Sequence, residues 1–309
     1  MMSGIKIADI AYVRFSAPDL GAMETFLGEF GLARAGGDSN TLYMRGAGAS
    51  PILHITHKGD PGFAGLGFAA ESVEDLERLA ANEGVRVSRS DAPGGGFIVT
   101  LSDPDGFRID VVAGQIPAAV EMLPNREATN DGHATPRTNL VKRIAPGPAH
   151  VLRLGHAVLN VTEFRRSEAW YKSRFGFITS DEIVIEGMPD SLGAFMRCDR
   201  GATPTDHHTL FLVGAGAPKF NHAAFEVADV DDLMAGHEYL KARQRTHEWG
   251  VGRHILGSQV FDYWRDPWGH AVEHWTDGDR LSADWGSRKT DFAELLGTQW
   301  GPAAPPTMA

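Results

Sequence analysis

Short stretches of alternating apolar and polar residues recur along the chain, and between them lie stretches with apolar residues at helical spacing. Residues 7–17 alternate as a strand does. A helix follows, ended by Gly31, with its apolar residues on one face: Leu20, Met23, Leu27 and Phe30. Further strands are predicted at 41–44, 51–56, 65–70, 97–101 and 107–112, and a second helix from Ser72 to Gly84.

The same order of elements returns in the second half of the chain. A strand at 154–161, a helix at 164–175 and strands at 194–198, 209–213 and 221–227 precede a helix at 229–244. The turn Asp266-Pro267-Trp268-Gly269 then repeats Asp103-Pro104-Asp105-Gly106. The shared order favours an internal duplication of about 150 residues. We therefore expect an α+β fold of two tandem modules, each made of paired βαβββ units that form an open barrel around a cup.

The repeat also predicts how the chain divides. Residues 1–113 would form the first module and residues 151–275 the second. Residues 114–150 are rich in Pro, Ala, Thr and Asn and lack periodicity, so they are expected to be a linker. Residues 276–309 would form a tail that wraps the second module.

Composition excludes several classes of protein. A net charge of −11 argues against a nucleic-acid-binding surface. The first ten residues carry Lys6 and Asp9 and resemble neither a signal peptide nor a membrane span. The single cysteine, Cys198, excludes an internal disulfide framework and a Cys-based zinc site, and it favours a cytoplasmic protein.

Candidate chemistry centres on Glu273, a carboxylate in an apolar strand. Such a group is costly to bury unless it is paired or binds a metal. Strand alternation places His156 and His222 on the faces opposite those that cover the helices, so all three side chains would look into one cup. Two imidazoles and one carboxylate with open positions are typical of non-haem Fe(II) sites, with Mn(II) as the alternative metal, whereas zinc favours a more closed set of ligands.

The first copy provides an internal control for this prediction. Aligning the copies puts Tyr12 at the position of His156, Gly65 at that of His222 and Asp110 at that of Glu273. A histidine in a strand is more often a core residue than a ligand, but a packing requirement would place histidines in both copies. The difference therefore favours a metal site in the second module only. Four other histidines are expected to be structural or on the surface: His237, His247, His270 and His274.

Residues 154–156, 220–227 and 252–275 resemble those of the type I extradiol ring-cleavage dioxygenases of the vicinal oxygen chelate superfamily. The resemblance covers both modules, the linker and the tail. It implies that His156, His222 and Glu273 bind Fe(II), or Mn(II) in some members.

The resemblance also implies roles for other residues. His208 would be the catalytic acid and base, because imidazole suits both roles near neutral pH. His254 and Tyr263 would donate hydrogen bonds to bound substrate oxygens, and Phe195 would line the substrate pocket. His207 is expected to face away from the pocket, by strand alternation, and the role of Arg253 is left open.

The implied function is the cleavage of a vicinal dihydroxy aromatic ring beside its diol, with O₂ as the second substrate, in the breakdown of aromatic compounds. A homo-oligomer is expected from the same resemblance. One alternative is a glyoxalase-like enzyme of this superfamily, but such sites commonly take ligands from both modules, and Tyr12 and Gly65 argue against it. The other is a non-enzymatic binding protein, which would not need His208, His254 and Tyr263 together.

Overall fold

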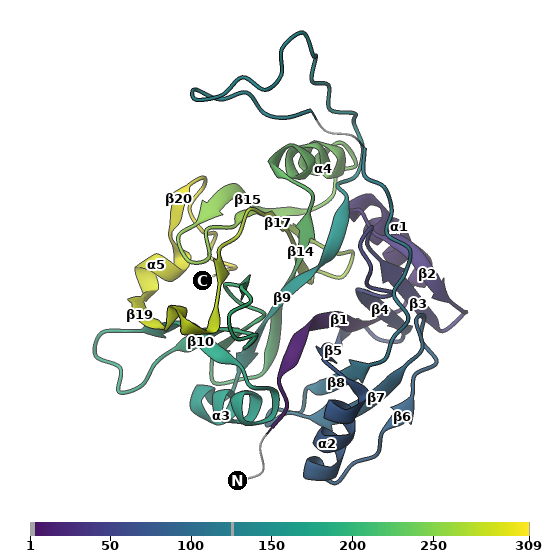
Figure 1. Ribbon diagram of the computed structural model, residues 1–309, viewed down its shortest axis with the longest axis vertical. Helices are drawn as coiled ribbons and strands as arrows, with labels where there is room; N and C mark the ends of the chain where they lie inside the picture. Colours follow the sequence, from purple (N-terminus) through teal and green to yellow (C-terminus); the bar gives the residue numbers. More distant parts are fainter. Residues whose placement is uncertain (1–3, 125–126, 309) are drawn as a thin grey trace.

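Two curved β-sheets make up most of the protein (Figure 1). The computed structural model describes residues 4–124 and 127–308. In the first sheet the strands lie in the order β2-β3-β4-β1-β5-β8-β7-β6. Its elements are β1 (Ile7–Ala17), α1 (Leu20–Phe30), β2 (Ala33–Gly37), β3 (Thr41–Arg45), β4 (His54–Lys58), β5 (Gly62–Ala70), α2 (Val73–Glu83), β6 (Ser88–Arg89), β7 (Phe97–Ser102) and β8 (Arg108–Ala113).

The second sheet has ten strands, in the order β19-β10-β11-β13-β9-β14-β17-β16-β15-β20. Its elements and their neighbours are β9 (Val151–Val161), α3 (Phe164–Phe175), β10 (Ile178–Val184), β11 (Gly193–Arg197), β12 (Thr205–Asp206), β13 (Leu210–Gly214), β14 (Lys219–Val227), α4 (Val230–Ala242), β15 (His247–His254), β16 (Val260–Arg265), β17 (Ala271–Thr276), β18 (Arg280–Leu281), η1 (Ala283–Trp285), β19 (Arg288–Asp291), α5 (Phe292–Leu296) and β20 (Thr298–Trp300).

The eight inner strands of the second sheet repeat the order of the first sheet, strand for strand. Figure 1 shows the second set curled around an open centre, with α3 and α4 on its outer side. The predicted α+β fold of two tandem modules, each an open barrel around a cup, is therefore confirmed.

The helices begin and end where their terminal residues favour it. Asp19, Ser72 and Asp229 each accept a hydrogen bond from a backbone N–H in the first turn of the following helix. Gly31 and Gly84 adopt the left-handed conformation directly after α1 and α2, which a residue with a side chain resists.

The segment after Thr276 is built into the second sheet. Strand β19 pairs in parallel with β10 at one edge, and β20 pairs antiparallel with β15 at the other. Both edges of the sheet are thereby covered by this one segment. The sequence predicted that it would contact the second module, but no apolar alternation had indicated these short strands, nor β2 and β10.

Residues 114–150 join the sheets, and their described part contains no helix or strand. In Figure 1 the described part of this segment runs past α1 and forms the long teal loop at the top. Several apolar side chains on it are exposed: Ile116, Val120, Met122, Leu140 and Val141.

The two sheets share one hydrophobic core. Phe15 of β1 packs edge-on against Phe220 of β14, and Phe68 of β5 packs against Phe175 of α3. His274 of β17 donates a hydrogen bond of 2.6 Å from Nε2 to the carbonyl of Phe30 and stacks on the Phe30 ring. Helix α1 of the first module therefore supports β17, the strand that carries Glu273. Within the described ranges, no helix has the length and apolar content needed to cross a membrane.

Candidate functional site

A row of residues in register crosses four adjacent strands of the second sheet. Ala224 of β14 pairs with His156 of β9 on one side and with Glu273 of β17 on the other. Glu273 in turn pairs with Tyr263 of β16. Directly opposed residues of neighbouring strands point to the same face of a sheet, and His222 lies two residues before Ala224 on that face. The structure therefore brings His156, His222 and Glu273 together.

The three side chains are buried and close enough to share one metal ion. The Nε2 atoms of His156 and His222 lie 3.4 and 3.5 Å from the same oxygen, Oε2 of Glu273. Glu273 is fully buried, and the two histidines are 2% and 8% exposed. One nitrogen from each ring and one carboxylate oxygen are thus directed at a common point.

The carboxylate of Glu273 lacks the partners that its burial requires. Neither oxygen has a hydrogen-bond partner among the described residues. At the equivalent position of the first sheet, Asp110 accepts hydrogen bonds from Arg14, Arg108, Tyr12 and Thr100. The guanidinium of Arg14 lies 2.6 Å from Asp110. The first copy therefore neutralises its carboxylate with arginine. Glu273 instead lies beside two imidazoles, and a divalent cation could bind to these imidazoles and to the carboxylate together.

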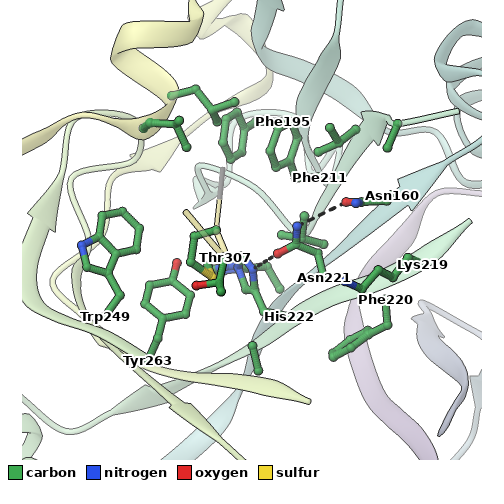
Figure 2. A pocket seen from close by; sticks show the side chains of 18 of the residues that line it. Asn160, Phe195, Phe211, Lys219, Phe220, Asn221, His222, Trp249, Tyr263 and Thr307 are labelled. Atoms are coloured by element: carbon green, nitrogen blue, oxygen red, sulfur yellow. Dashed lines mark hydrogen bonds between the residues drawn. The ribbon is translucent and has the colours of Figure 1, made fainter. Parts of the chain in front are cut away.

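A short hydrogen-bond chain fixes the orientation of His222. Its Nδ1 donates to Oδ1 of Asn221 at 2.8 Å, and Nδ2 of Asn221 donates to Oδ1 of Asn160 at 3.2 Å, as the dashed lines in Figure 2 show. A proton held at Nδ1 leaves Nε2 as the free electron pair. Metal-binding histidines commonly have such a partner on the second ring nitrogen.

Burial sets the ionisation of these groups. It lowers the pKa of His156 to about 3 and holds the pKa of His222 well below its usual value, so both rings are neutral near pH 7. Burial raises the pKa of Glu273 to about 7, and the nearby His254 ring and Tyr263 hydroxyl oppose this rise. Neutral imidazoles are the form that binds metals, and a bound cation would keep Glu273 ionised.

His254 and Tyr263 lie on the hairpin formed by β15 and β16, beside this cluster. Nε2 of His254 is 3.1 Å from the Tyr263 hydroxyl and 3.9 Å from Oε1 of Glu273. Burial lowers the pKa of His254 to about 4 and raises that of Tyr263. His254 and Tyr263 both line a cavity that His156 and His222 also line. These two histidines and Glu273 form the group of candidate metal ligands.

His208 also lines the cavity. Its ring lies 3.9 Å from the ring of His156 and 4.8 Å from the ring of Phe195, measured between centroids. His207 does not line the cavity, yet it contacts His208 through the two Nδ1 atoms, 3.1 Å apart. Strand alternation is not a sound basis for placing either ring, because β12 ends at Asp206.

The cavity has a volume of about 450 Å³. Phe195 and Phe211 stack face to face 3.9 Å apart on one wall, and Trp249 and Tyr263 lie across from them (Figure 2). Near the opposite end stand the polar side chains Lys219, Asn221 and Asn160. The arrangement suits a flat aromatic molecule whose polar edge faces the histidines.

Comparison with known proteins identifies the family. The family described as Glyoxalase/Bleomycin resistance protein/Dioxygenase superfamily matches residues 153–274. Metapyrocatechase 2 of Cupriavidus necator is 30% identical over 305 residues, which cover 97% of this chain and 90% of that protein. The chain belongs to the extradiol dioxygenases of this superfamily.

Solved structures of the superfamily share its fold. The Mn(II)-bound glyoxalase of Novosphingobium aromaticivorans matches with a TM-score of 0.81 at 23% identity, covering 98% of this chain and 94% of that one. The substrate complex of homoprotocatechuate 2,3-dioxygenase from Brevibacterium fuscum matches with a TM-score of 0.80 at 19% identity, covering 100% and 93%. Both extradiol dioxygenases and a glyoxalase are thus built on this arrangement of sheets.

A second group of possible metal ligands lies on the outer side of the sheet of this extradiol dioxygenase: His237, His247 and Asp262. Both oxygens of Asp262 already accept hydrogen bonds, from His247 at 2.8 Å and from the indole of Trp264 at 2.6 Å. The carboxylate is therefore satisfied without a cation, in contrast to Glu273. This agrees with the structural role predicted for these two histidines.

Sequence reasoning missed several residues that surround the dioxygenase site. Asn221 directly precedes a candidate ligand, and that adjacency was the one signal available for it. Asn160, Trp249 and Asp181 come from other strands and carried no signal. Arg253, whose role was open, pairs with Asp277 and does not line the cavity.

Proposed function

We propose that this protein is an Fe(II)-dependent extradiol dioxygenase that uses O₂ to cleave a vicinal dihydroxy aromatic ring beside its diol. The observation that carries the proposal is the buried carboxylate of Glu273, whose oxygens lack hydrogen-bond partners among the described residues and face two neutral imidazoles. His156, His222 and Glu273 would hold the iron, with Mn(II) as the alternative. Residues 151–275 would then be the catalytic module, residues 1–113 a module without metal, residues 114–150 a linker and residues 276–309 a supporting tail.

Iron bound there would supply the positive charge that favours an ionised catechol and the redox capacity that O₂ chemistry requires. The chain's own residues would do the rest. His208 accepts the proton of a catechol hydroxyl and later returns a proton to the ring-opened product. His254 and Tyr263 donate hydrogen bonds to the substrate oxygens and hold them at the site, and Phe195 packs against the ring.

The relatives support a dihydroxy aromatic substrate. One is named metapyrocatechase, and others are named 1,2-dihydroxynaphthalene dioxygenase and biphenyl-2,3-diol 1,2-dioxygenase. A cavity of about 450 Å³ with apolar walls leaves room for a ring that carries a substituent. We therefore propose a substituted catechol or a trihydroxylated ring, used in the degradation of aromatic compounds.

The experiment is a substrate panel under controlled oxygen. Protein reconstituted with Fe(II) without air is mixed with catechol, alkyl-catechols, dihydroxybiphenyl and a trihydroxybenzene, with Mn(II)-loaded protein in parallel. Consumption of one O₂ per ring, together with a yellow ring-fission product, supports the proposal. Metal-loaded protein that consumes no O₂ with any member of the panel contradicts it.

The structural similarity to a Mn(II)-bound glyoxalase makes a glyoxalase-like enzyme the main alternative function. A glyoxalase-like site would draw ligands from both modules. Here Tyr12 and Arg14 donate hydrogen bonds to the carboxylate of Asp110 in the first sheet, and Gly65 has no side chain that could bind a metal. Isomerisation of a glutathione hemithioacetal without O₂ uptake would favour that rival, and small-molecule binding without any turnover would favour a binding protein.

We further propose that the enzyme works as a homo-oligomer in the cytoplasm. The exposed apolar side chains of residues 114–144 offer a surface that a second subunit could cover. Cys198 is buried and free, as a reducing compartment allows. Light scattering coupled to size exclusion tests the assembly, and a monomer at micromolar concentration would contradict it.

A further inference from the structure

Three residues stand in line behind His208, on the side away from the cavity. Nδ1 of His208 lies 3.1 Å from Nδ1 of His207, and Nε2 of His207 lies 2.6 Å from Oδ2 of Asp181. The other oxygen of Asp181 accepts a hydrogen bond of 2.6 Å from Nε of Arg288. Asp181 and Arg288 are cross-strand neighbours on β10 and β19. The line therefore runs from a guanidinium in the segment after Thr276 to an imidazole of the site.

The chemistry of the donors fixes where the protons lie along this line. Arg288 only donates, and although burial acts to raise the pKa of Asp181, His207 and Arg288 hold that pKa below its usual value. Asp181 is thus an ionised acceptor, so Nε2 of His207 must carry a proton. When His207 carries this single ring proton, its Nδ1 has the lone pair, and His208 makes the 3.1 Å contact by donating from its own Nδ1.

His207 is held too firmly to leave this position. It is 4% exposed, and its carbonyl accepts a hydrogen bond of 2.5 Å from Oγ of Ser180. Its backbone N–H donates to the carbonyl of Asp279 at 2.9 Å. Ser180 in turn accepts from Arg197, a buried guanidinium, at 2.8 Å. A histidine whose backbone and ring are both held by hydrogen bonds is suited to orienting a neighbouring side chain, here His208.

We propose that Asp181 and His207 are positioning residues that set the tautomer of His208, so that its Nε2 is the proton acceptor presented to the cavity. This inference rests on the function proposed above, in which His208 accepts a substrate proton. Neither Asp181 nor His207 lines the cavity, so both act through His208. Their arrangement is the one by which a carboxylate commonly fixes a histidine tautomer, extended here by a second imidazole.

The decisive variant is Asp181→Asn. The cation of Arg288 would take the amide oxygen, which turns the NH₂ group toward Nε2 of His207 and makes that nitrogen an acceptor. His207 would then donate from Nδ1, and the proton of His208 would move to Nε2. We expect kcat to fall by roughly 10²- to 10⁴-fold, the range of acid–base contributions, with KM and bound metal little changed. Asp199→Asn, which alters an ion pair with Lys6 away from the cavity, is the matched control.

Two substitutions of His207 separate positioning from packing. The oxygen of Asn can lie near the former Nδ1, whereas the amide of Gln reaches toward the former Nε2. His207→Asn should therefore retain an acceptor for His208 and keep kcat within about tenfold, whereas His207→Gln should lose as much as Asp181→Asn. A role in packing alone predicts the reverse order, because Gln fills more of the space.

The tautomer itself is measured in metal-free protein labelled with ¹⁵N-histidine, by long-range proton–nitrogen correlation spectra. The wild type should show His208 protonated at Nδ1, and Asp181→Asn should show it protonated at Nε2. An unchanged His208 tautomer in Asp181→Asn, or a His207→Gln variant more active than His207→Asn, overturns the inference. The spectra do not depend on turnover, so inactive wild-type protein with the expected tautomer would refute the proposed function alone.

Discussion

The unpartnered carboxylate of Glu273 predicts an unusual response to mutation. Burial raises its pKa from 4.5 to about 7 in the metal-free protein. A carboxyl group whose folded-state pKa is raised destabilises the protein as the pH rises from the unfolded pKa through the folded one. The loss of stability therefore begins near pH 4.5 and is complete above pH 7. A shift of this size amounts to about 3 kcal/mol.

Glu273→Gln removes this ionisation and keeps the size of the side chain. In metal-free protein at pH 8, the variant should be more stable than the wild type by about 3 kcal/mol, with a Tm higher on the order of 5 °C. At about pH 4 the difference should nearly vanish, because the carboxyl group is then largely protonated in both the folded and the unfolded state. With Mn(II) or Fe(II) present the order should reverse, because only the wild type keeps the carboxylate ligand and gains stability by binding.

The first sheet supplies the matched control. Asp110→Asn is the same chemical change at the equivalent position, but Asp110 is paired with Arg14. Removing one partner of a buried ion pair costs roughly 3 to 5 kcal/mol, so this variant should be destabilised where Glu273→Gln is stabilised. Thermal and urea unfolding of the chelator-treated proteins measures both. A Glu273→Gln variant less stable than the wild type at pH 8 would refute the reasoning, because the carboxylate would then have a stabilising partner.

Three further predictions concern the metal and the reaction. His156→Ala should lower bound metal at least tenfold by elemental analysis and abolish the rise of Tm with Mn(II), whereas His237→Ala, outside the cavity, should leave both unchanged; equal metal content in the two would argue against the ligand set. His208→Phe should retain metal and lose roughly 10²- to 10⁴-fold in kcat, and a variant that also empties the site would show that His208 had been misassigned. Affinity for Mn(II) should fall roughly tenfold per pH unit below pH 7, because the proton on Glu273 must leave before the metal binds. His156, with a pKa of about 3, adds no such loss above pH 5. A Mn(II) affinity that stays constant from pH 6 to pH 8 would contradict this.

Much of this arrangement could be predicted from the sequence because it depends on local rules. Strand alternation has a period of two, so the faces of His156 and His222 followed from their apolar neighbours. The helices were predictable from capping residues such as Asp19 and Gly31, which act within one turn. The repeat then indicated that the two halves share one fold, because two copies of one pattern adopt one topology.

The remainder depends on contacts between segments far apart in the chain. Asp181 meets Arg288 only because β19 returns to pair with β10, and nothing in either short strand indicates that pairing. Asn160 accepts a hydrogen bond from Asn221, the partner of His222, across 61 residues of sequence. The face of His207 was inferred from alternation, which does not apply beyond the end of β12 at Asp206.

The hydrogen bond from His274 to the carbonyl of Phe30 ties β17, the strand that carries Glu273, to helix α1 of the first module. If the two sheets were separate chains, this contact would be an association equilibrium and would be lost on dilution. Joined by residues 114–150, the two modules make it within one chain, at an effective local concentration on the order of millimolar. The first module is therefore a permanently tethered partner of the second, and at nanomolar protein the contact that supports β17 depends on this covalent connection.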